Sequence, residues 1–315
     1  MYRIIAREYR YNHIKRGICF VHLCYNYYMK QKQMTKNDHL ERVNEVLFYI
    51  HGAIQKNFLV EELSSSVAMS PFHFNRIFKE VTGESLHAYI KRVKLEHAAN
   101  LLLFNPDATI THIMHEVGFS SNASFSQAFK ENLGVTPTKW REVDKANEYR
   151  DYTFAHKPLD VKICSMPSFE VAYVRHKGYD RSIKMAWLKL QEWSLRHDIS
   201  FSQQCMIGLH HSNPRFVEST QCHYVACLEL PFHKKFYRSA EVGVMRIPQT
   251  FCAVFSLQGK YGDLKKYMDV IYHEWLPQSD YEKASLPSFA VYRQNHFINA
   301  DETFDLDFCV PVRFK

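Results

Sequence analysis

The stretch SPFHFNRIFKE at residues 70–80 is followed, 51 positions later, by the related stretch SNASFSQAFKE at residues 121–131. The glycine that comes after each stretch, Gly83 or Gly134, keeps the same offset. Apolar residues recur at helical spacing in both copies, as Phe74 and Phe78 do in the first. The repeat predicts two equivalent amphipathic helices, each with one buried stripe.

Each predicted helix has local signals for its first and last residues. Ser70 and Ser121 are favourable N-caps, because a serine hydroxyl accepts a hydrogen bond from an unpaired amide of the first turn. Gly83 and Gly134 suit the left-handed backbone that ends many helices. The two helices are therefore expected to begin and end at matching positions.

A shorter helix and a turn are predicted before each of these helices. Their apolar positions are Leu59, Leu63 and Val67 in the first unit and Ile110, Ile113 and Val117 in the second. A short helix, a tight turn and a second helix with a polar outer face make a helix-turn-helix unit. In such units the second helix enters the major groove of DNA.

The outward residues of the two second helices are the candidate DNA contacts. Arg pairs well with guanine, and Asn or Gln with adenine, because their donors and acceptors match those base edges. The predicted set is Phe72, Asn75, Arg76 and Lys79 in the first unit, and Asn122, Ala123, Ser126, Gln127 and Lys130 in the second. An ordinary helical bundle with solvated polar faces is the alternative, which the match between two units disfavours.

A long helical pattern from Ser85 to Phe104 joins the two units, and Asn105-Pro106 ends it. Lys91, Arg92 and Lys94 cluster on this helix. A rigid helix would hold both units at a fixed separation, and adjacent turns of the major groove lie about 34 Å apart. We expect one chain to contact two neighbouring grooves of double-stranded DNA.

Net charge does not carry this prediction. The 315-residue chain has a formal net charge of +7, but residues 1–33 hold seven basic residues and one acidic residue. Residues 34–145 hold 12 basic and 13 acidic residues, so the case for DNA rests on pattern. Residues 1–38 are expected to be a disordered extension, and a basic arm that touches phosphates is the alternative.

The second half of the chain changes to alternating apolar and polar residues typical of strands. Met166-Pro167 matches Ile247-Pro248, and Trp193 matches Trp275, at offsets of 81 and 82. The expected fold class is α then α+β. An all-helical double helix-turn-helix domain at 39–145 and a linker at 146–157 precede a duplicated β-α-β-β domain at 158–315. Its helices, at about 181–196 and 262–276, should cover one face of a sheet and leave a concave groove on the other.

The first half resembles the AraC/XylS family of bacterial transcription regulators over roughly residues 39–143. The resemblance rests on residues that include Phe78-Lys79, Gly118-Phe119, Phe129-Lys130 and Gly134-Val135-Thr136-Pro137. It implies DNA binding near promoters, RNA polymerase as a further partner, and activation more than repression. Many relatives carry Arg where this chain has Gln127, which would soften contact with the second groove or change the base preferred there.

The second half resembles the GyrI-like effector-binding domain over about residues 158–314. The matching residues include Asn213-Pro214 and Glu274-Trp275-Leu276-Pro277. In relatives a groove binds small organic ligands, often aromatic cations, and the acid of a Phe-Glu-x-Tyr motif supplies the counter-charge. Here that motif reads Phe289-Ala290-Val291-Tyr292, so the acid is missing.

Without that acid we expect a neutral or weakly polar effector, a cation held only by aromatic rings, or no ligand. The candidate effector-binding residues are Tyr173, Tyr224, Trp275, Phe289, Ala290 and Tyr292. Plain core packing of these aromatic residues is the alternative. Some relatives hydrolyse reactive small molecules with the groove Glu, so a hydrolase-like or small-molecule-binding protein with secondary DNA binding is the second reading. Ala290 argues against catalysis.

Other chemistry finds little support in the sequence. The eight cysteines form no CxxC pair, which favours reduced thiols, and the 18 histidines show no recurrent ligand spacing, so no metal is expected. No phosphate-binding loop, dinucleotide fingerprint or nucleophile elbow is present, so no cofactor is expected. No apolar run approaches about 18 residues, which argues against a membrane span. We expect a cytoplasmic, nucleoid-associated protein.

Overall fold

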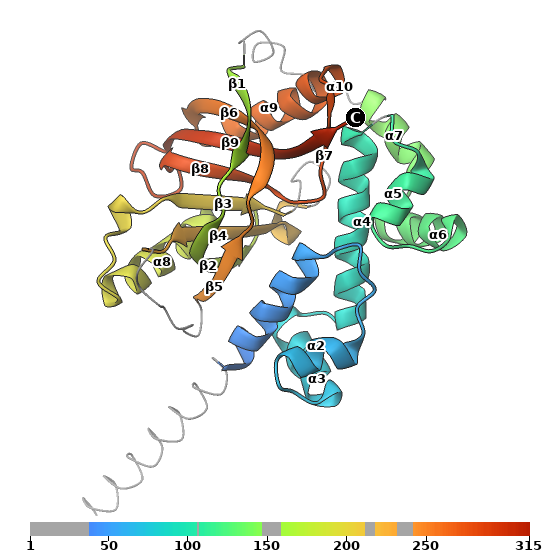
Figure 1. Cartoon of the computed structure of the whole chain (residues 1–315), viewed down its shortest axis with the longest axis horizontal. Coiled ribbons are helices and arrows are strands. Elements are labelled where there is room, and N and C mark those ends of the chain that lie inside the picture. Colours follow the sequence, from blue (N-terminus) through green and yellow to red (C-terminus); the bar gives the residue numbers. More distant parts are fainter. Residues whose placement is uncertain (1–37, 106, 147–158, 212–217, 232–241) are drawn as a thin grey trace, which may run out of the picture.

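The computed structural model describes residues 38–105, 107–146, 159–211, 218–231 and 242–315. A helical domain packs against the side of a large β-sheet (Figure 1). The helical domain contains a helix at residues 38–52, then α2 (Val60–Ser66), α3 (Pro71–Thr82), α4 (Leu86–Phe104), α5 (Ile110–Glu116), α6 (Asn122–Leu133) and α7 (Pro137–Ala146). Of the predicted extension at 1–38 and the predicted linker at 146–157, the structure describes only Asp38 and Ala146, and both belong to helices, so each prediction was one residue too long at that end.

The long helix α4 carries one helix-turn-helix unit near each end (Figure 1). Phe74 and Phe78 are fully buried in a core shared with the helix at residues 38–52, and Phe125 and Phe129 are fully buried in a second core with α4 and α5. The predicted face of α2 is wrong at one position. Leu59 is 60% exposed, because α2 begins only at Val60 and Leu59 is its N-cap.

The predicted helix ends of both units are confirmed. The Ser70 hydroxyl accepts from the His73 amide at 3.4 Å, and the Ser121 hydroxyl accepts from the Ser124 amide at 3.2 Å. Gly83 and Gly134 have φ angles of 82° and 81°, the left-handed conformation that ends each helix.

The second domain is one antiparallel sheet with the strand order β1-β6-β9-β8-β3-β4-β2-β5 and a short β7 beside β9. The first half of the sequence repeat supplies β1 (Val161–Met166), β2 (Phe169–Lys177), α8 (Lys184–Arg196), β3 (Met206–His210) and β4 (His223–Glu229). The second supplies β5 (Gly243–Ile247), β6 (Thr250–Lys260), α9 (Asp263–Val270), α10 (Leu276–Gln278), β7 (Tyr281–Lys283), β8 (Ser288–Gln294) and β9 (Thr303–Phe314).

The first half contains one strand more than the predicted β-α-β-β unit, and the second contains two more, one of which is the short β7. Pro167 and Pro248 interrupt the first extended segment of each half, because proline has no amide to donate to a ladder. The strands that come before these prolines, β1 and β5, pair with the opposite half, β1 with β6 and β5 with β2. The duplicated halves are thus joined at three places, since β3 also pairs with β8.

The helices α8 and α9 cover the same face of the sheet, as predicted. Trp187 of α8 and Leu264 of α9 share the main core with Tyr224, Phe255 and Phe308 from the strands. The opposite face has its own core, formed by residues of alternate parity such as Val171 and Ile207. Within the described residues, none of the helices is both long enough and apolar enough to cross a membrane.

Candidate nucleic-acid interface

The helix α3 presents an exposed stripe over a buried one. Phe72 is 84% exposed, and Asn75, Arg76 and Lys79 are also exposed, whereas Phe74 and the other inward residues lie in the core. Exposed positions at intervals of three and four residues lie on one face of a helix. The four residues predicted to contact DNA from the first unit therefore lie together.

The helix α6 presents an equivalent stripe. Ala123, Gln127 and Lys130 are exposed and Ser126 is half-buried. These positions follow Phe72, Arg76, Lys79 and Asn75 at the constant offset of 51. Asn122 is also exposed, at the first residue of the helix, where its Nδ2 donates to Thr111 Oγ1 at 3.2 Å.

The two stripes differ in how their central side chains are held. The Arg76 guanidinium lies 3.4 Å from His73 Nδ1 and makes no ion pair with any described carboxylate. Gln127 Nε2 instead donates to Glu131 Oε1 at 3.0 Å, and Lys91 Nζ of α4 donates to Glu131 Oε2 at 3.0 Å. The Lys91 hydrogen bond is the main reason that the pKa of Glu131 is lowered. Arg76 is open to a base edge, whereas Gln127 must leave Glu131 to reach one.

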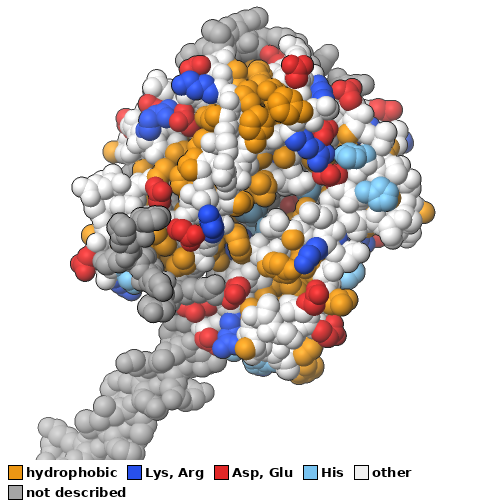
Figure 2. Space-filling model, viewed as in Figure 1, with side chains coloured by type: hydrophobic (Ala, Val, Ile, Leu, Met, Phe, Trp, Pro, Cys, Tyr) orange, Lys and Arg blue, Asp and Glu red, His pale blue; other side chains and the backbone are white. Residues whose placement is uncertain are grey.

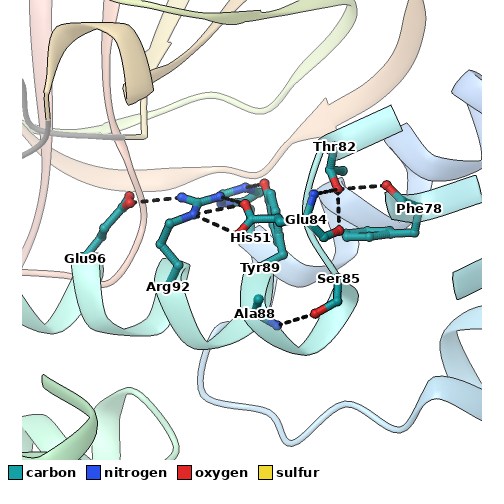
Figure 3. Close-up of polar contacts among 9 residues, drawn as sticks. All are labelled: His51, Phe78, Thr82, Glu84, Ser85, Ala88, Tyr89, Arg92 and Glu96. Carbon is teal, nitrogen blue, oxygen red and sulfur yellow. Dashed lines mark hydrogen bonds and ion pairs between the residues drawn. The ribbon is translucent and has the colours of Figure 1, made fainter. Parts of the chain in front are cut away.

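The basic cluster of α4 contributes to structure. Arg92 bridges Glu84 at 2.6 Å and Glu96 at 2.9 Å (Figure 3). Lys94 is 5% exposed and its Nζ donates to Asn57 Oδ1 at 3.3 Å. These ion pairs and hydrogen bonds hold α4 in place between the two units. Sequence reasoning missed the contacts with Glu84 and Asn57, because both partners lie outside α4, whereas Arg92 and Glu96 are four residues apart on α4 itself.

Comparison with known proteins supports both halves of this description. Residues 63–142 match the family described as a helix-turn-helix domain, and residues 159–313 match the family described as a GyrI-like small molecule binding domain. The probable transcription factor PqrA of Proteus vulgaris is 33% identical over 102 residues, which cover 32% of this chain and 83% of PqrA. The chain belongs to the AraC family.

This AraC-family chain spans only about a third of the length of some other curated relatives. The Msm operon regulatory protein of Streptococcus mutans is 33% identical over 32% of the chain, and the chain spans only 36% of that protein's length. A cryo-EM structure of an EcmrR–DNA complex aligns with 81% of the chain and 99% of its own, at 11% identity and a TM-score of 0.42.

The effector-binding residues predicted for the GyrI-like domain do not line one groove. Tyr224, Ala290 and Tyr292 are buried against α8 and α9, and the Tyr224 and Tyr292 hydroxyls lie 3.3 Å apart. Tyr173 and Phe289 belong to the core of the opposite face. The structure therefore divides the predicted set between two faces of the sheet.

The space beside Ala290 in this AraC-family chain is occupied by its own side chains. The Trp187 ring of α8 meets the Tyr292 ring edge-on at 5.8 Å, and both residues are under 5% exposed. Trp275 is half-buried and packs edge-on against Phe255 at 5.0 Å. Asn213-Pro214, a further matching pair, lies outside the described residues.

Proposed function

We propose that this AraC-family protein is a sequence-specific DNA-binding regulator of transcription, in which α3 and α6 enter two adjacent segments of the major groove. The observation that carries the proposal is the pair of equivalent exposed stripes. Both lie above buried phenylalanines, and they flank the single helix α4.

The chemistry of the stripes supports direct readout of bases. Arg76 presents a planar donor pair that suits guanine, and Asn75 and Gln127 present amides that suit adenine. Lys79 and Lys130 lie one turn further along their helices, where they would bind phosphates. The first unit would dominate recognition, because Gln127 is engaged by Glu131 in the free protein.

The wider role of the protein rests on its family. We propose that it acts in the cytoplasm as an activator that contacts RNA polymerase, and that the GyrI-like domain senses a small molecule or contacts a partner. Ala290 stands where relatives that act as hydrolases have their acid, which favours a non-enzymatic role.

Selection of bound sequences from a library of random duplexes tests the DNA-binding proposal. The full chain should enrich one bipartite sequence, whose two segments have centres about 10 base pairs apart, one turn of the duplex. Enrichment of a single short segment would contradict the role of α6. No enrichment above the starting library would contradict sequence-specific binding altogether.

A further inference from the structure

A cavity of about 350 Å³ lies between the helical domain and the sheet face opposite α8 and α9. One wall comes from the end of the helix at residues 38–52 and the turn that follows it, and the other comes from β3, β5 and β8. Figure 2 shows hydrophobic side chains gathered over the sheet on this side of the molecule. The apolar residues of the walls include Phe48, Tyr49, Ala53, Leu209, Met245, Ile247 and Phe289.

This cavity is distinct from the groove suggested by the family resemblance. Phe289 lines the cavity, whereas the neighbouring Ala290 points to the other face, into the core beneath α8. Successive side chains of a strand point to opposite faces of the sheet. A ligand in this cavity would contact neither Tyr224 nor Tyr292.

One cationic side chain in the cavity wall, which is half-buried, forms no ion pair with a described residue. Arg175 of β2 lines the cavity, and its Nε is buried without a hydrogen-bond partner among the described residues. Its guanidinium carbon lies 5.4 Å from the centre of the Tyr173 ring. None of the described lining residues is acidic. A half-buried guanidinium whose Nε is covered and unpaired is stabilised by a nearby negative charge, so the site favours an anion at this position.

The other basic residues of the cavity are less suited than Arg175 to pair with an anion. His51 and His211 lie with their rings 4.4 Å apart, and burial lowers the pKa of both well below the usual histidine value. Arg246 is exposed at the rim, 3.7 Å from Glu170 and 3.1 Å from Ser168 Oγ. Arg175 is thus the inward-facing fixed positive charge among the described lining residues.

We propose that this cavity binds a small apolar molecule that carries one carboxylate, with the Arg175 guanidinium as its counter-charge. A volume of 350 Å³ lies within the range of small-molecule sites, and guanidinium binds a carboxylate through two parallel hydrogen bonds. The proposal names the effector site of the regulator proposed above. It rests on that function for its regulatory consequence and not for binding itself.

The position of the cavity couples it to the first DNA-binding unit. The helix at residues 38–52 contributes Val43, Leu47 and Ile50 to the core that holds Phe74 and Phe78. His51, in the cavity wall, has its Nε2 2.8 Å from the Tyr89 hydroxyl of α4 (Figure 3). A ligand that contacts both this helix and the sheet therefore contacts the helix against which α3 packs. Such a shared element allows ligand binding and DNA binding to change each other's affinity.

Calorimetric titration of the full chain with three naphthalene probes tests the site. The anion 2-naphthoate should bind at least about tenfold more tightly than neutral 2-naphthamide or cationic 2-naphthylmethylammonium, because only it pairs with Arg175. Arg175→Gln should weaken 2-naphthoate by about tenfold and Arg175→Lys by less, since lysine keeps the charge but loses the planar fork. The matched variant Arg246→Gln, at the rim, should change binding by less than about twofold.

Equal binding of the three probes would overturn the proposal, and so would unchanged 2-naphthoate binding by Arg175→Gln. Duplex binding without any probe is measured on the same preparations. Specific duplex binding without 2-naphthoate binding would refute the cavity and leave the proposed function standing. Charge-selective, Arg175-dependent binding of 2-naphthoate by a chain that binds no duplex would support the cavity and refute the proposed function.

Discussion

The side-chain amide of Asn105 pairs with the main chain of Lys283 as a neighbouring strand would. Asn105 Nδ2 donates to the Lys283 carbonyl oxygen at 3.2 Å, and the Lys283 amide donates to Asn105 Oδ1 at 2.9 Å. Both residues are buried, and the Phe104 ring stacks on Tyr272 at 4.0 Å beside them. This contact ties the end of α4, which joins the two DNA-binding units, to β7 of the GyrI-like domain.

Replacing Asn105 with Ala should destabilise the junction between the domains. The substitution leaves a buried amide and a buried carbonyl of Lys283 without partners, at a cost of about 1–3 kcal/mol each. Chemical denaturation of the full chain measures the loss in free energy of unfolding. Asn100→Ala is the control, because Asn100 is half-buried on the same helix and forms no such pair among the described residues. Equal losses for the two variants would contradict the importance of this contact.

Two phenylalanines of α3 should separate stability from DNA binding. Phe74→Ala empties a fully buried site and should cost about 3–5 kcal/mol of unfolding free energy. Phe72 is 84% exposed, so Phe72→Ala should change stability by less than about 0.5 kcal/mol while weakening binding to the selected duplex. Denaturation and duplex titration of both variants check this. Unchanged duplex binding by Phe72→Ala would remove Phe72 from the interface.

Neutralising Glu131 should improve recognition of the second segment. Glu131→Gln removes a negative charge beside the proposed phosphate ligand Lys130 and releases Lys91 from its ion pair. We expect roughly two- to fivefold tighter duplex binding, in line with an exposed charge interaction. Glu80→Gln is the matched variant at the equivalent position of the first unit, and fluorescence titration at two salt concentrations compares them. Only Glu131→Gln should sharpen discrimination at the second segment. Weaker binding by Glu131→Gln would show that the Gln127–Glu131–Lys91 arrangement positions Gln127 for DNA.

The free energy of unfolding of the chain should fall as the pH drops below the ordinary pKa of a histidine side chain. Burial, with a smaller effect of Lys283, lowers the pKa of His97 from 6.5 to about 3, so the unfolded chain binds this proton more readily. The stability that the chain gains by keeping His97 neutral is fully present above the unfolded pKa of 6.5. It is lost as the pH falls towards the pKa of His97 in the folded chain. The unfolded His97→Met chain no longer takes up this proton. Between pH 6 and 4 its unfolding free energy should therefore fall with a slope about 1.4 kcal/mol per pH unit smaller than that of the wild type.

Denaturation curves of wild type and His97→Met at several pH values measure this difference. Above about pH 7 the two pH profiles should run parallel, because the histidine is then neutral in both the folded and unfolded chains. Identical slopes at low pH would show that His97 becomes protonated without unfolding.

The residues that define the two helix-turn-helix units were predictable because their signals are local. Ser70, Phe74 and Gly83 act within one helix, and the second copy repeats them. The exchange of β1 and β5 between halves was not predictable, because strand register depends on partners about 90 residues apart, as Val161 and Phe255 are. The link between Asn105 and Lys283 spans 178 positions and left no local trace beyond the end of α4.

The sequence does contain a signal that the predicted effector-binding residues lie on two faces of the sheet. Phe289 and Ala290 are neighbours on one strand, so they could not have faced the same groove. The same alternation places Arg175 in line with Val171 and Tyr173, as a charged residue on an apolar face. A charged residue at a position that faces an apolar core is therefore the sequence signal for the cavity.

The contribution of each helix to base readout is the central claim, and Arg76→Ala and Gln127→Ala test it most directly. Binding of each variant is measured against the selected duplex, duplexes altered in one segment, and a random duplex, with Lys130→Ala as the phosphate control. Arg76→Ala should lose about 1–3 kcal/mol of discrimination at the first segment only, and Gln127→Ala should affect the second segment only. Lys130→Ala should weaken all duplexes alike and reduce the salt dependence. Equal loss on specific and random duplexes for Arg76→Ala would contradict the account.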